Sequence, residues 1–122
     1  MLLNRKPFVS AAAEVLKSTE TEKFVSASAI TDIYYIAYRE LRDKSLVKDL
    51  LRRLLQAVHV AGVCETEISR ALNSDWTDFE DCVQNAVAET HCFDAVITRN
   101  PTDFAKSALK ILLPTEFLEL SR

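Results

Sequence analysis

The segment TDFEDC, residues 77–82, holds three carboxylates, those of Asp78, Glu80 and Asp81. Two further aspartates, Asp32 and Asp103, stand in other segments that are expected to begin helices. Carboxylate oxygens are the hard ligands that Mg²⁺ and Mn²⁺ prefer, and such an ion polarises a phosphate and lowers the pKa of a bound water. The chemistry that these residues could support is therefore metal-assisted chemistry on a phosphate.

Each of these acids, taken singly, also fits a structural role at a helix start. Thr77 and Glu80 have capping-box spacing, so Glu80 is expected to reach back to the Thr77 amide. Asn100 as the cap, Pro101 as the first helical residue and Asp103 at the third helical position make an equally good helix start. An acid in a first turn gains about 0.3–1 kcal/mol from the helix dipole.

Helical spacing separates the members of the acidic cluster. Asp78, Asp81 and Asn85 fall on one face of the expected helix, whereas Glu80 points elsewhere. Three helix starts that each bring an aspartate to the same end of a sheet are less easily explained by capping alone. The acids expected to hold a metal ion are Asp32, Asp78, Asp81 and Asp103.

Short apolar strands alternate with helices along the chain. The predicted helices cover residues 8–19, 29–43 (capped by Ser28), 45–56, 64–74 and 78–91, and Pro114 opens a last helical turn. The predicted strands lie within residues 23–28, 57–63, 94–98 and 108–113. This alternation predicts an α/β sandwich with a parallel sheet between helices, in which the site lies at the carboxyl ends of the strands.

Charge is unevenly distributed over the 122 residues, whose net charge is −3. Residues 39–53 hold six basic and three acidic side chains, so this segment is locally positive. Solvated helix faces are the simpler interpretation of such a run, and a grip for phosphates is the more specific one. The residues that we expect to bind phosphates are Arg39, Arg42, Lys48 and Arg52.

The length and composition predict one globular domain over residues 1–122 and exclude several functional classes. A single glycine, Gly62, rules out a glycine-rich phosphate loop. The three cysteines have no paired spacing, which favours free thiols in a reducing cytoplasm. No apolar run approaches the length of a membrane span, so we expect no membrane partner.

Three stretches together resemble a PIN domain, in the branch that is similar to the toxins of bacterial toxin–antitoxin pairs. They are SASAITDIYYIAYR, DWTDFEDCVQNAVAETHCFDAVITRNPTDF and ALKILLPTEFL. The resemblance implies a three-layer α/β/α sandwich with a central parallel sheet of strand order 3-2-1-4-5. It also implies a Mg²⁺- or Mn²⁺-dependent ribonuclease site made of about four acids.

Residue by residue, Asp32, Asp81 and Asp103 match the second, third and fourth acids of the family. They are the catalytic residues that the resemblance implies. Asp78 matches an accessory acid of this branch. The supporting polar residues, at the TRN strand end and on the acidic helix, are Thr98, Arg99, Asn100 and Asn85.

The chain departs from the family pattern at its front. It begins MLLNRKPF, where the family has a hydrophobic strand ending in the first acid before such a segment. A truncated gene, a start assigned too late and a shortened form of the protein remain open as explanations. We therefore expect weak metal binding and impaired or absent ribonuclease activity in this form. The alternatives are an active endoribonuclease toxin and a non-catalytic interaction domain that keeps only the fold.

The expected partners follow from the same resemblance. RNA is the implied substrate and an antitoxin protein is an implied partner. In the order 3-2-1-4-5 the absent strand is the central one, which would leave backbone groups of its two neighbours without hydrogen bonds. The neighbours would pair directly, accept a strand from another chain, or remain a wet edge. We expect a homodimer, because an exposed apolar strand edge invites self-association.

Overall fold

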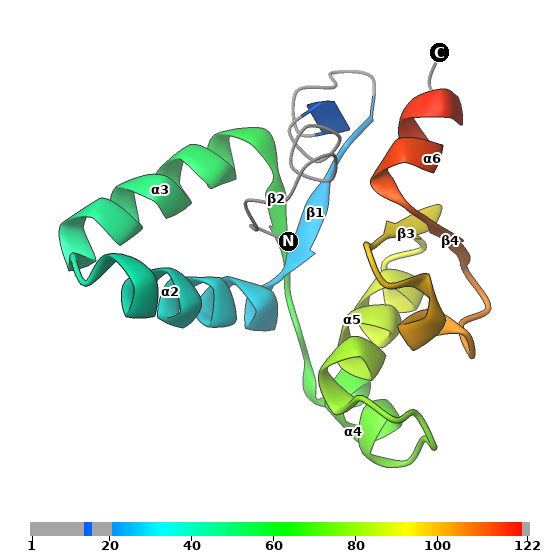
Figure 1. Ribbon diagram of the computed structural model, residues 1–122. Helices are drawn as coiled ribbons and strands as arrows, with labels where there is room; N and C mark the ends of the chain where they lie inside the picture. The colour runs from blue at the N-terminus through cyan, green and yellow to red at the C-terminus, as the bar shows by residue number, and fades with distance from the viewer. Residues whose placement is uncertain (1–13, 16–20, 121–122) are drawn as a thin grey trace. The chain divides into compact units, whose positions relative to one another are not determined.

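The computed structural model describes residues 14–15 and 21–120 (Figure 1). The chain divides into two compact units, of which unit 2 is Thr19–Val63 and unit 1 combines Met1–Ser18 with Cys64–Arg122. The positions of the chain's parts relative to one another are not determined, so each unit is described by itself. The single-domain organisation expected from the sequence stays a prediction, and most of the expected helix 8–19 lies outside the described residues.

Unit 2 is a parallel strand pair joined by a helical hairpin. Its elements are β1 (Phe24–Ser26), α2 (Ala27–Leu41), α3 (Lys44–Ala57) and β2 (His59–Ala61). β1 and β2 run parallel, with Val25 opposite Val60. Parallel strands need a crossover connection, and here the two helices supply it (Figure 1).

The cap of α2 is Ser26. The sequence pattern predicted Ser28 instead, so that prediction was wrong by two residues. The Ser26 hydroxyl accepts a hydrogen bond from the Ala29 amide at 3.2 Å. The ladder explains the shift, because pairing with Ala61 keeps Ser26 extended and the helix begins directly after it. At the other end Arg42 adopts the left-handed conformation, with φ of 54°, and Asp43 then caps α3.

Unit 1 holds the acidic segment between helices and a second parallel strand pair. Its elements are α4 (Glu65–Leu72), α5 (Phe79–Thr90), β3 (Ala95–Ile97), the short 3₁₀ helix η1 (Pro101–Phe104), β4 (Lys110–Leu112) and α6 (Pro114–Leu120). β3 and β4 are parallel, with Val96 opposite Ile111. The segment that leaves β3 at its carboxyl end leads directly into η1.

The core of unit 1 is built around α5. Its buried apolar side chains are those of Cys82, Val83, Ala86, Val87 and Ala88. α4 packs against this helix and contributes a buried acid, Glu67, which is only 2% exposed. Glu67 accepts hydrogen bonds from the Cys64 amide at 2.7 Å and from the Thr90 hydroxyl at 3.3 Å, so its burial is compensated.

The α/β class predicted from the sequence is confirmed by these parallel strands and their helical connections. The two pairs correspond to neighbours 2–3 and 4–5 of the expected strand order. The helices at 29–43, 45–56, 64–74 and 78–91 are each found within two residues of their expected ends. No helix in the described part of the chain combines the length and apolar character that a membrane span requires.

Helix α5 ends in a Schellman motif that places a cysteine where glycine is preferred. The Phe93 amide bonds to the Ala88 carbonyl at 2.9 Å, and the Cys92 amide bonds to the Glu89 carbonyl at 3.1 Å. Between them Cys92 adopts a φ of 57°, in the left-handed region. A side chain there carries a steric penalty that glycine avoids.

Cys92→Gly is therefore expected to raise the free energy of unfolding by up to about 1 kcal/mol, the relieved strain being partly offset by a freer unfolded chain. Cys92→Ala is the matched control, because it removes the thiol but keeps the Cβ atom. Urea denaturation of both variants measures the difference. Equal stability of the two variants would contradict the strained position.

Candidate active site

The acidic segment begins α5, with Asp78 as its cap. The Asp78 carboxylate accepts a hydrogen bond from the Asp81 amide at 2.8 Å. The sequence-based assignment of Thr77 as the cap was therefore wrong by one residue. Asp78 takes the role because it has the extended backbone of a cap, with φ of −109° and ψ of 117°. One carboxylate oxygen of Asp78 thus has a structural role, while the side chain also lines a pocket.

Asp81 lies three positions further on, half-buried in the first turn of α5. Burial raises the pKa of the Asp81 carboxyl above its ordinary value, and the nearby charges of Asp78 and then Asp103 raise it further. Like charges raise the pKa of an acid only when they lie close to it. Three of the four acids expected at the site are therefore gathered in unit 1.

Asp103 is positioned by the segment that follows β3. The Thr98 amide extends the ladder by donating to the Leu112 carbonyl at 2.9 Å. The Thr98 hydroxyl then accepts the Asn100 amide at 3.1 Å, which turns the chain into η1. Asn100 stands at the cap position but makes no capping bond with its side chain, so the expected Asn100 cap was wrong in that respect. Arg99, which lies between Thr98 and Asn100 in the sequence, is half-buried.

Asn85 connects α5 to the segment beyond η1. Its side chain is buried, and its amide oxygen accepts a hydrogen bond from the Ser107 hydroxyl at 2.5 Å. Its amide nitrogen donates to Glu89 at 2.7 Å, and Glu89 in turn pairs with Arg70 of α4 at 3.4 Å. The sequence analysis expected Asn85 to support the site, and the structure places it where it ties the Asp103 segment to the Asp81 helix.

Ser107→Ala and Asn85→Ala are each expected to lower the free energy of unfolding by about 1–3 kcal/mol, because each leaves a polar partner that is buried (Asn85) or half-buried (Ser107) without its hydrogen bond. The double variant should be less destabilised than the sum of the single variants, with a coupling of about 0.5 kcal/mol or more. Chemical denaturation of the four proteins measures this coupling. Additive effects would show that the two side chains do not act as a pair. Thr66→Ala is the control, because Thr66 is exposed, and it should change the free energy of unfolding little.

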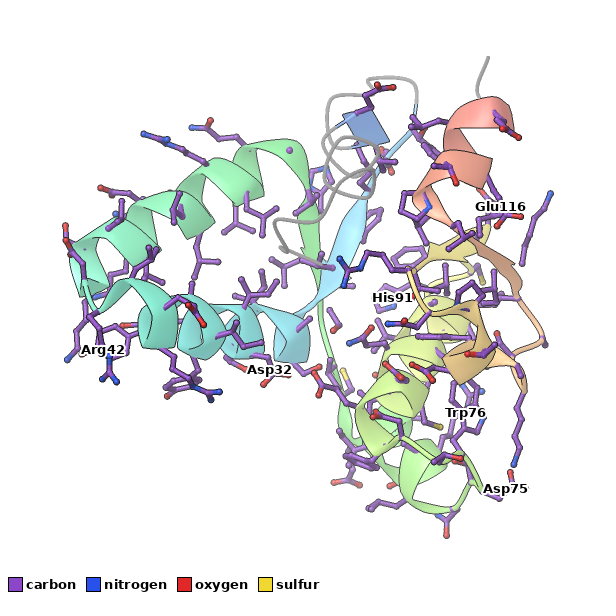
Figure 2. All side chains as sticks on the ribbon, viewed as in Figure 1. Asp32, Arg42, Asp75, Trp76, His91 and Glu116 are labelled. Carbon is purple, nitrogen blue, oxygen red and sulfur yellow. The ribbon has the colours of Figure 1, made fainter. Side chains whose placement is uncertain are left out.

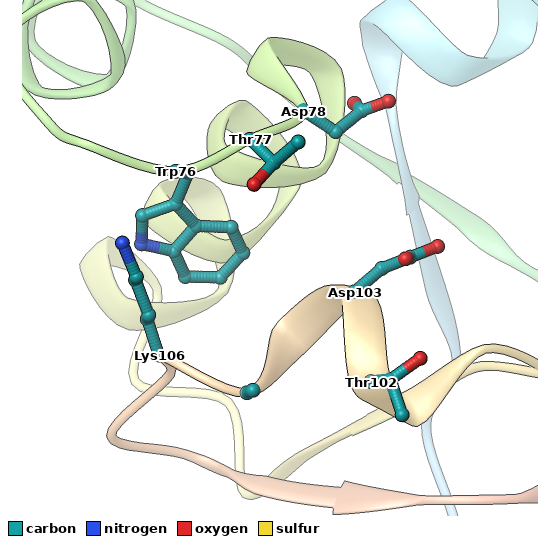
Figure 3. A pocket seen from close by; sticks show the side chains of 7 residues that line it. Trp76, Thr77, Asp78, Thr102, Asp103 and Lys106 are labelled. Atoms are coloured by element: carbon teal, nitrogen blue, oxygen red, sulfur yellow. The ribbon is translucent and has the colours of Figure 1, made fainter.

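A pocket of about 400 Å³ lies beside these acids, between the α4–α5 loop and η1. The residues lining it are Trp76, Thr77, Asp78, Thr102, Asp103, Ala105 and Lys106. Figure 3 shows the Asp78 and Asp103 carboxylates directed to the same side, with the Trp76 ring and Lys106 on the other. The pocket thus has an acidic edge and an edge formed by an aromatic ring and an ammonium group.

Two contacts hold the walls of this pocket together. The Lys106 ammonium group lies 3.0 Å from a carboxylate oxygen of Asp75 and donates to its carbonyl at 2.9 Å. Trp76 meets the buried Phe104 edge to face, with ring centroids 5.7 Å apart. The sequence analysis missed Trp76 and Lys106. For Trp76 the available signal was a tryptophan in a polar loop beside an acidic cluster. For Lys106 the sequence held no signal, because the fold alone brings it to that loop.

The remaining predicted site residues lie in unit 2. Asp32 is half-buried in the first half of α2 (Figure 2), and its distance from the acids of unit 1 stays undetermined. The expected phosphate-binding residues, Arg39, Arg42, Lys48 and Arg52, are all exposed. Arg52 pairs with Asp49 at 2.7 Å, which partly neutralises it. The convergence of Asp32 with Asp81 and Asp103 therefore stays a prediction.

Comparison with known protein families shows to which family the chain belongs. The chain matches the PIN domain family over residues 1–102, a span that includes Asp32 and Asp81 and ends just before Asp103. The chain belongs to the PIN domain family. No curated protein and no solved structure gives a match. PIN domains are generally nucleases that use Mg²⁺ or Mn²⁺, so the acids of unit 1 are judged against that chemistry.

The donor set of this PIN domain suits such an ion. Mg²⁺ is usually held by one or two carboxylates while it keeps several waters, and Asp81 and Asp103 lie close enough for the charge of Asp103 to raise the pKa of Asp81. In the described residues no three His, Cys, Asp or Glu side chains form a ready metal cage. The acids of unit 1 therefore fit part of a hydrated cation site in their chemistry, and any further ligand comes from elsewhere.

The raised pKa of Asp81 predicts a pH dependence of stability in metal-free buffer. Folded Asp81 holds its proton more tightly than the unfolded chain does, so stability falls as the pH rises from below the ordinary value of 3.8 through the raised folded value. Asp81→Asn should therefore be more stable than the unmodified protein at neutral pH, and the difference should vanish in acid. Thermal unfolding across this pH range measures it.

Asp75→Asn is the control of opposite sign for that experiment. Its hydrogen bond and ion pair with Lys106 lower the pKa of the Asp75 carboxyl, so the pairing is present above the ordinary value and lost as the pH falls. This exposed substitution should give no gain in stability at neutral pH. A gain as large as that of Asp81→Asn would show that general charge reduction, and not the burial of Asp81 and its repulsion by nearby acids, is responsible.

Proposed function

We propose that this PIN domain acts on RNA as a metal-dependent nuclease, with Asp81 and Asp103 as ligands of Mg²⁺ or Mn²⁺. The observation that carries the proposal is the gathering of Asp78, Asp81 and Asp103 beside an open pocket, where burial and then the charges of Asp78 and Asp103 raise the pKa of Asp81. Carboxylates gathered without a cation repel one another, and a bound divalent ion relieves that repulsion. Membership of a family of nucleases supports the same chemistry.

The residues have distinct roles in this proposal. Asp81 and Asp103 hold the ion, and Asp78 contributes negative charge while its hydrogen bond fixes the first turn of α5. The bound ion would polarise the scissile phosphate and lower the pKa of the attacking water. Asp32 is proposed as a further ligand from α2, as the family resemblance implies. The exposed Arg39, Arg42 and Lys48 would bind the RNA backbone.

Metal binding is the first test. Mn²⁺ is expected to bind weakly and to raise the melting temperature, and Asp81→Asn should weaken binding by about tenfold, a loss of about 1.4 kcal/mol. Glu80→Gln is the matched control, because it removes the same charge from the adjacent, exposed position. Calorimetric titration measures the affinities. Equal Mn²⁺ affinity of the Asp81 variant and the unmodified protein would overturn the proposed ligand.

Cleavage of single-stranded RNA is the second test. We propose low activity for residues 1–122, dependent on Mn²⁺ or Mg²⁺ and lost in Asp81→Asn and Asp103→Asn. A labelled oligoribonucleotide resolved on a gel measures it, with EDTA and Glu80→Gln as controls. Cleavage that survives both aspartate substitutions would contradict the assigned site.

Three further parts of the proposal concern a protein partner, the oligomeric state and the cellular compartment. A toxin-like PIN domain would bind an antitoxin protein, and we propose a homodimer because an exposed strand edge favours self-association. The free cysteines Cys64, Cys82 and Cys92 favour a reducing cytoplasm. Light scattering at micromolar concentration separates a dimer from a monomer.

A further inference from the structure

The pocket beside the acids contains features that metal binding does not use. The indole of Trp76 lines it, and Trp76 is the only tryptophan of the chain. The ring is half-buried and braced on one side by Phe104, which is 3% exposed. A flat aromatic surface held in place and left partly open can stack against a planar ligand with little further loss of entropy.

The charges around the pocket restrict what it can hold. Asp78 and Asp103 disfavour an anion at their edge (Figure 3). Lys106 is paired with Asp75, so its attraction for a phosphate is reduced. What remains for a ligand is the indole and the hydroxyl groups of Thr77 and Thr102. These surroundings suit a planar, uncharged group that carries hydrogen-bonding atoms on its edge.

We propose that this pocket is a nucleobase subsite, in which one base of the RNA stacks on Trp76 next to the phosphate that a metal ion at Asp81 and Asp103 would bind. This inference rests on the proposed function and deepens it. Bases of single-stranded RNA are commonly bound by stacking on aromatic side chains, because every base has a flat face. The volume of about 400 Å³ lies in the range of small-molecule pockets.

The position of the subsite gives it a role in cleavage. Trp76 and Asp78 are two positions apart in the loop before α5, and Asp103 and Lys106 come from the opposite wall. A base seated on the indole would therefore place its own sugar–phosphate next to the acidic edge. Stacking would orient single-stranded RNA and exclude a paired base, whose faces are covered by its neighbours in the duplex.

The single tryptophan makes the subsite directly measurable without metal or cleavage. Adenosine, a neutral nucleoside, is titrated into the protein in EDTA while the fluorescence of Trp76 is recorded. We expect a saturable change in fluorescence. Ala105→Leu fills the pocket from an exposed position and should weaken adenosine binding by about tenfold, a typical effect of losing a stacked base.

Ala108→Leu is the matched control, because Ala108 is exposed and does not line the pocket. It should bind adenosine as the unmodified protein does. A fluorescence change that is linear in adenosine, as for N-acetyltryptophanamide, would overturn the subsite. Equal binding by the two leucine variants would overturn it as well.

RNA cleavage separates failure of the subsite from failure of the proposed nuclease. If both proposals hold, Ala105→Leu raises the KM for a short single-stranded RNA by about tenfold and leaves Mn²⁺ affinity unchanged. Adenosine binding without any metal-dependent cleavage would overturn the nuclease and support the pocket. Cleavage with an unchanged KM in Ala105→Leu would overturn the pocket and support the nuclease.

Discussion

Burial of Asp81 close to two other carboxylates is the constraint on which the acidic end of unit 1 depends. Burial, and then the charges of Asp78 and Asp103, raise the pKa of Asp81, so an ionised Asp81 carboxylate is destabilising at this position. Packing elsewhere must hold these acids together. The buried α5 helix and the Asn85–Ser107 hydrogen bond tie the two acidic segments to one framework.

Asp78 combines a structural role with a place at the edge of the pocket. It caps α5 through one carboxylate oxygen and still contributes its charge to the acidic edge of the pocket. A helix start suits this double use, because the dipole there favours a negative charge that the neighbouring acids disfavour. Capping and metal chemistry are therefore not competing explanations of the segment TDFEDC, residues 77–82. Glu80, which is exposed, is outside that arrangement.

The two contacts that join the walls of the pocket differ in kind. Asp75 and Lys106 form an exposed ion pair, which contributes little stability but limits where Lys106 can lie. Trp76 and Phe104 form an apolar contact anchored in the core. The acidic edge is thus backed by a rigid aromatic wall. This combination gives the proposed RNA site a place for a base as well as for a phosphate.

The sequence by itself determined the elements and the types of residue at the site. Apolar periodicity placed α3 and α5 within a residue of their ends, because burial of one helix face requires that spacing. The PIN likeness predicted Asp32, Asp81 and Asp103 as the catalytic acids, and that assignment stays a prediction. Only tertiary structure decided which neighbour becomes a cap, since strand pairing held Ser26 extended and so moved the helix start from Ser28. It alone also brought Lys106 to Asp75, a contact between distant segments that no local pattern encodes.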